Sequence, residues 1–76
     1  MKNNKMYDEY LMLNKQIDIC IDTMFKCIDE NNVNMFSIFY KMFFETRSKL
    51  YKNKYNQCGH KLCDEIENFA KCNNIS

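Results

Sequence analysis

The feature that most constrains this chain is its lack of helix-breaking residues: its 76 residues include no proline and only one glycine. Inside a helix, proline costs about 3 kcal/mol and glycine about 1 kcal/mol relative to alanine. Long helices therefore meet few obstacles here, whereas a fold of many short strands would need frequent turn residues. We predict an all-α fold with few, long helices.

Length and composition predict a single helical domain over residues 1–76. Apolar residues make up 46% of the chain and charged residues 28%, with a net charge of +1, which is typical of globular proteins rather than disordered chains. A chain of this length supports one core and is near the size at which a metal, disulfides or a partner often add stability. No secretory signal or membrane-spanning apolar run is recognisable, so we expect a cytoplasmic protein.

Apolar residues recur every three or four positions in the first part of the chain, which predicts an amphipathic helix over about 5–30. The apolar face consists of Tyr10, Leu13, Ile17, Cys20, Met24 and Cys27. Asn4 is well placed to cap the first turn, and the pair Asn31 and Asn32 to end the helix. Because one face is apolar, this helix must pack against another element.

The rest of the chain predicts two more helices, over about 35–58 and about 60–72. Gly59 lies between them and is expected to end the second helix in the left-handed conformation that glycine adopts most readily. Short connections make consecutive helices antiparallel neighbours. The expected fold is therefore a three-helix bundle, in which the first two helices form a long antiparallel hairpin and the shorter third helix folds back along it.

A third helix that starts near residue 60 is too short to cover the whole hairpin. At about 1.5 Å per residue, it should run beside the first helix and end level with Cys20 and Thr46. The uncovered part of the hairpin carries a larger apolar patch than a monomer usually exposes. The patch consists of Met24, Phe25, Ile28, Met35, Phe36, Phe39 and Met42. We expect it to bind a protein, either a second copy of this chain or a different partner.

The single histidine and the single glycine lie close together, between two cysteines. Thiolates and imidazole bind zinc tightly, so Cys58, His60 and Cys63 are a candidate three-ligand zinc site with an outside fourth ligand. Cys72 is excluded because nine helical residues after Cys63 correspond to about 13 Å along the axis. In the alternative, Gly59 ends a helix and the cysteines, odd in number and without a Cys-x-x-Cys pair, are reduced thiols.

The end of the second predicted helix carries lysines interleaved with tyrosines. Lys49, Tyr51, Lys52, Lys54 and Tyr55 form the kind of basic and aromatic surface that a nucleic-acid-binding helix presents. The net charge of only +1 weakens this interpretation, because such proteins usually carry a larger basic excess. Lysines at a helix C-terminus also complement the helix dipole. Nucleic-acid binding stands as the alternative to protein binding.

Catalysis is not expected, because two long helices and a short one offer little cleft that excludes water. We predict a non-enzymatic protein-binding module, either a homodimer or a stoichiometric adaptor or inhibitor, without a cofactor unless the zinc site forms. Lysine outnumbers arginine ten to one, which is typical of AT-rich genomes: those of some low-GC bacteria with their phages and plasmids, of certain parasites and of several large viruses. A small mobile-element protein that blocks host machinery fits this size and composition.

Overall fold

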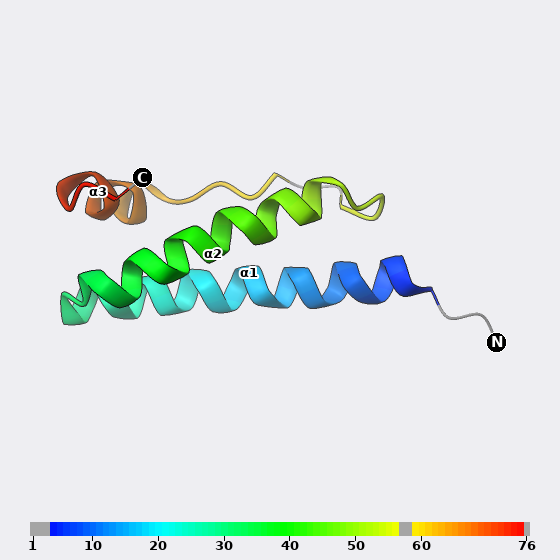
Figure 1. The fold of residues 1–76 in the computed structure, drawn as a ribbon, viewed down its shortest axis with the longest axis horizontal. Helices are drawn as coiled ribbons and strands as arrows, with labels where there is room; N and C mark the ends of the chain where they lie inside the picture. Colours follow the sequence, from blue (N-terminus) through cyan, green and yellow to red (C-terminus); the bar gives the residue numbers. More distant parts are fainter. Residues whose placement is uncertain (1–3, 57–58, 76) are drawn as a thin grey trace.

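The computed structural model describes residues 4–56 and 59–75, and these residues form three helices and no strand (Figure 1). α1 spans Lys5–Glu30, α2 spans Val33–Tyr51 and α3 spans Asp64–Cys72. α1 and α2 pack along their length as an antiparallel hairpin, which gives the molecule an elongated shape of 48 × 18 × 15 Å. The predicted all-α fold, a long hairpin with a short third helix, is confirmed.

Asparagines define both ends of α1 and the start of α2. The Asn4 side chain accepts a hydrogen bond from the Tyr7 backbone N–H at 3.2 Å. Asn31 ends α1 in the left-handed conformation, with φ of 54°, which asparagine tolerates better than most residues. Asn32 then caps α2 by accepting from the Met35 N–H at 3.2 Å. The predicted end of the first helix is confirmed, and α2 begins slightly earlier than expected.

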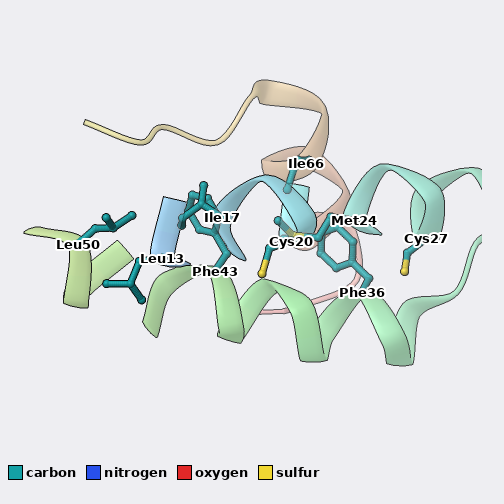
Figure 2. Close-up of a cluster of buried hydrophobic side chains, with 10 residues drawn as sticks. Leu13, Ile17, Cys20, Met24, Cys27, Phe36, Phe43, Leu50 and Ile66 are labelled. Atoms are coloured by element: carbon teal, nitrogen blue, oxygen red, sulfur yellow. The ribbon is translucent and has the colours of Figure 1, made fainter. Parts of the chain in front are cut away.

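The hydrophobic core lies between α1 and α2 and is completed by α3 near the α1–α2 turn. Figure 2 shows side chains of the hairpin helices pointing toward one another, with Ile66 reaching in from α3. The buried apolar residues are Leu13, Ile17, Cys20, Met24, Cys27, Phe36, Phe43, Leu50, Ile66 and Ala70. In the described part of the chain, no helix has an apolar stretch long enough to cross a membrane.

α2 ends at Tyr51, so Gly59 does not end it and the predicted second helix is too long. Asn53 explains the early end. Its side-chain Nδ2 donates to the Met6 carbonyl at 2.8 Å, and its Oδ1 accepts from the Tyr55 N–H at 2.9 Å. Asparagine side chains that bond nearby backbone in this way favour turns over helix. Here the same side chain also ties the turn to the first turn of α1.

The predicted position of the third helix is wrong as well. Residues 59–63 form no helix and run back along α2 toward the α1–α2 turn (Figure 1). Arg47 Nη1 holds this segment by donating to the His60 carbonyl at 2.9 Å. Extended chain advances about 3.3 Å per residue, against about 1.5 Å in a helix. α3 therefore begins only at Asp64 and packs beside the turn of the hairpin, instead of ending level with Cys20 and Thr46.

Candidate interaction surface

The seven residues of the predicted apolar patch differ in how much of their surface is exposed. Met24 and Phe36 are fully buried, each with 0% of its surface exposed. Four further members are half-buried and pack against the core: Phe25, Ile28, Phe39 and Met42. Met35, with 42% of its surface exposed, is the accessible member. The patch as a whole is thus not the open surface expected from the sequence, and the partner-binding role of its accessible members remains a prediction.

α3 covers Phe36, on one side of this patch. Its Phe69 ring meets the Phe36 ring edge-on, with centroids 4.7 Å apart, and its Ile66 is fully buried. The helix lies against one side of the hairpin, on which α2 presents Phe36, Phe44 and Arg47 to α3 and to the segment before it. From the sequence we expected the apolar residues near the turn to be uncovered, because the predicted third helix lies too far from the turn.

The other side of the hairpin remains open. A groove of about 310 Å³ lies there between the two long helices and is lined in part by Thr23, Lys26 and Cys27 of α1 and by Met35 and Phe39 of α2. Helical residues are about 100° apart, which places Met35 and Phe39 on the side of α2 away from Phe44. We call this side of the hairpin the open flank.

On α1, the open flank continues from the groove toward the N-terminus. Residues three, four or seven positions apart share a face of a helix, so Ile19 lies on the same face as Thr23 and Lys26, and Met12 follows Ile19. Both are unusually accessible for apolar residues, with 50% of Ile19 and 70% of Met12 exposed. Met12 and Ile19 are thus the exposed apolar side chains of α1 on this flank, whereas Met6, Tyr7 and Leu11 are exposed elsewhere on the first turns of the helix.

On α2, the same spacing rule places Ile38 and Met42 beside Met35. Ile38 is 56% exposed, whereas Met42 is half-buried. Between the helices, Gln16 Nε2 donates to Thr46 Oγ1 at 3.0 Å, which fixes the relative position of α1 and α2 on this side. The apolar strip of the open flank therefore consists of Met12, Ile19, Met35, Ile38, Phe39 and Met42.

Met12, Ile19 and Ile38 were not among the residues predicted to bind a partner. The sequence does carry a signal for them, because Met12 and Ile19 are seven positions apart and lie outside the regular apolar face of α1. A second set of apolar residues at helical spacing is redundant for a single core. Its presence is the sequence feature that points to a second apolar surface.

The candidate zinc ligands do not come together among the residues described. Cys58 lies outside the described residues, so the three-ligand arrangement remains a prediction. His60 is half-buried, and its Nε2 is buried without a hydrogen-bond partner within residues 4–56 and 59–75. Cys63 is exposed and precedes α3 without capping it through its side chain. In the same ranges, no three His, Cys, Asp or Glu side chains lie close enough together to hold a metal ion.

Four of the five cysteines lie in the described ranges, and all four are free. Burial raises the pKa of the Cys20 thiol. The pKa of Cys27 is raised by burial and, to a smaller extent, by the negative charge of Glu30, against an opposing effect of Lys26. Both thiols are therefore protonated near neutral pH and act as small apolar core residues. Cys63 and Cys72 are exposed.

The basic residues predicted to contact nucleic acid are accessible but do not share one helix. Lys49, Lys52 and Lys54 are exposed, yet α2 ends at Tyr51 and leaves the last two in the following turn. Tyr51 is 54% exposed. Tyr55 is half-buried and packs edge-on against the Tyr7 ring at 5.3 Å, while the Lys54 ammonium lies 5.3 Å above the Tyr55 ring.

This arrangement gives Tyr55 a structural role. Its hydroxyl also accepts a hydrogen bond from the Asn4 side chain, so the ring joins the turn after α2 to the start of α1. A ring occupied in this way is less available for stacking on a base. Nucleic-acid binding by this end of the molecule remains a prediction, without the continuous basic helix that suggested it.

A second hollow, of about 300 Å³, lies between α2 and the segment that leads into α3. Its charged lining consists of Arg47 and Lys61 opposite Asp64 and Glu67. The Arg47 guanidinium lies 4.6 Å from the centre of the Phe44 ring and bonds the His60 carbonyl. With charges of both signs and an arginine already engaged, this hollow shows no preference for an anion or a cation.

Comparison of the chain with protein-family models, curated proteins and solved structures found no match. The proposal for function therefore rests on the geometry of the surfaces and on the sequence itself. Among the surfaces described above, the open flank combines accessible apolar side chains with a groove and a fixed helix pair.

Proposed function

We propose that this protein is a non-enzymatic protein-binding module that uses the open flank as its interface. The observation that carries the proposal is the uncovered apolar strip on the side of the hairpin opposite α3. Each 100 Å² of apolar surface removed from water contributes roughly 2.5 kcal/mol. Large apolar side chains grouped on one face are therefore a favourable docking surface.

A binding role fits the chemistry of the groove better than catalysis does. The one thiol in its lining belongs to Cys27, whose surface is only 3% exposed. Because burial raises its pKa, this thiol is mostly protonated near neutral pH and is a poor nucleophile. The rest of the lining is apolar, neutral polar or charged, and consists of Met35, Phe39, Thr23, Asn32, Lys26 and Glu30.

The composition supports a more specific version of this role. A chain of this size acts by occupying a surface of another protein in a fixed ratio, as an adaptor or an inhibitor does. The lysine-rich composition favours an origin in an AT-rich phage or another mobile element, with a host protein in the cytoplasm as the target. This extension rests on composition and is independent of the open flank.

The proposal is tested by placing a photo-crosslinking amino acid at Ile19 and, as a matched control, at Asn68. Both positions are exposed on helices, but Asn68 lies on α3, away from the open flank. In cells that naturally produce the protein, we expect discrete adducts from position 19, with a second copy or with another protein, and few from position 68. Equal labelling from both positions, or none from position 19, would contradict the proposal.

A further inference from the structure

We infer that the open flank is covered by a second copy of this chain, with the two α1 helices antiparallel about a two-fold axis near Ile19. This inference rests on the proposed function, because it names the partner of that same surface. Three observations support it: the order of charges along α1, their symmetry about Ile19, and the area of the flank.

The outward side of the open flank on α1 follows a regular spacing of three and four residues. The residues at these positions are Met12, Lys15, Ile19, Asp22 and Lys26, and all five are exposed. This is the heptad spacing with which helices pack against one another. An apolar residue stands at its centre, with a positive charge on one side and a negative charge on the other.

An antiparallel partner makes this order of charges self-complementary. With the axis at Ile19, Lys15 lies opposite position 23 of the second copy, about 1.5 Å along the axis from its Asp22. The two-fold repeats this pair, so two Lys15–Asp22 contacts flank an Ile19–Ile19 contact. A parallel, in-register partner would instead place every charge opposite its own copy, which is unfavourable.

Beyond Lys15 and Asp22 the series is mixed: the exposed acids Asp8 and Glu30 lie opposite each other and oppose the pairing, so the Lys15–Asp22 contacts are the ones that favour it. Met12 lies opposite position 26 of the second copy, where the aliphatic stem of Lys26 can cover it while the ammonium stays in water. On α2, the exposed Met35 and Ile38 lie near the hairpin turn, and the two-fold at Ile19 places them opposite the Lys49 end of α2 in the second copy. The resulting pair of hairpins resembles a four-helix arrangement with α3 on the outside of each copy.

The open flank has the area of a small interface. It extends over the 19 residues of α2, a length of about 28 Å, and two helices packed about 8–10 Å apart are together about 19 Å wide. Each copy therefore offers roughly 500 Å², which is at the small end of the range for specific interfaces and predicts a weak dimer.

The arrangement is tested by charge reversal, using sedimentation equilibrium of the full chain between about 5 and 200 µM, the range in which weak interfaces of this size dissociate. Wild type should dimerise. Lys15→Glu and Asp22→Lys should each raise the dimer dissociation constant about tenfold, because each changes two symmetry-related contacts. The double variant K15E/D22K should return it to within about threefold of wild type. Lys71→Glu, the same reversal on α3, should leave it unchanged.

Three outcomes would overturn the inference. The first is a wild-type chain that stays monomeric over the whole range, and the second is a dimer that the double variant fails to restore while its helical circular dichroism matches wild type. Rescue of Lys15→Glu by Glu45→Lys instead would indicate α1 packed on α2 of the second copy and would also overturn it. The crosslinking experiment at position 19 tests the proposed function independently of the dimer. Adducts with a different protein would still support the open flank as an interface if the chain proved monomeric.

Discussion

At the scale of single residues, asparagines determine where the helices begin and end. Asn31 and Asn32 form the turn of the hairpin, and the sequence predicts them because asparagine is a common cap. The role of Asn53 in ending α2 was not predictable in the same way. Its effect depends on the Met6 carbonyl, to which it donates at 2.8 Å across 47 positions of sequence, and no local pattern reveals such a contact.

Asn53→Ala should lower the free energy of unfolding by about 1–3 kcal/mol, because it removes two part-buried hydrogen bonds to backbone groups. Asn53 is only 4% exposed, and its side chain bonds both the Met6 carbonyl and the Tyr55 N–H. Urea unfolding followed by circular dichroism measures the change. Asn68→Ala, at an exposed position of α3, should stay within about 0.5 kcal/mol of wild type. Equal effects of the two variants would show that Asn53 does not fix the end of α2.

The buried thiols provide a prediction that depends on pH. Because burial raises the pKa of Cys20 and Cys27 above the ordinary value of 9.0, the native state retains their protons after the unfolded chain has lost them. Their contribution to stability is therefore complete below about pH 9 and is lost as the pH rises through the folded pKa. Near pH 8, iodoacetamide followed by peptide mapping should modify Cys63 and Cys72 at least tenfold faster than Cys20 and Cys27. Comparable rates for all four would contradict the burial.

At the scale of elements, the spacing of apolar residues predicts the helices but not the non-helical segment between them. The apolar face of α1 is confirmed, since Leu13, Ile17, Cys20, Met24 and Cys27 are all buried. The extended segment 59–63 was missed because Gly59 and its neighbours fit a helix junction equally well. That one error misplaced the third helix along the hairpin, so the cover that Phe69 gives to Phe36 was not predicted.

The packing of α3 against the hairpin should contribute to the stability of the whole fold. Ile66 is fully buried, so Ile66→Ala should lower the free energy of unfolding by about 2–5 kcal/mol. Because Phe69 covers Phe36 from the same helix, the variant should also expose that ring and increase binding of a hydrophobic dye. Glu65→Ala, at the exposed neighbouring position, is the control. A change below about 0.5 kcal/mol for Ile66→Ala would show that α3 is not docked.

At the scale of the whole molecule, the sequence predicts that the turn half of the hairpin stays uncovered, and this prediction is wrong because α3 packs beside the turn. The position of α3 depends on the extended segment after α2, which the apolar pattern does not reveal. α3 covers the side of Phe36 and Phe44, and the open flank is left with Ile19 and Met35. An uncovered apolar surface is therefore present, but it lies along one side of the hairpin and most of its residues differ from those predicted.

The central claim is that the open flank is an interface, and substitution at its centre tests it most directly. Ile19 is 50% exposed and outside the core, so Ile19→Asp should leave the helix content and unfolding midpoint close to those of wild type. It places two carboxylates against each other at the two-fold axis, and should raise the dimer dissociation constant roughly a hundredfold. Asn68→Asp on α3 serves as the control for the added charge.

The decisive measurement is sedimentation equilibrium of wild type, Ile19→Asp and Asn68→Asp at about 100 µM, a concentration at which a micromolar interface is largely occupied. We predict dimers for wild type and Asn68→Asp, and a folded monomer for Ile19→Asp. A monomeric wild type, or an Ile19→Asp variant that remains dimeric, would contradict self-association through the open flank.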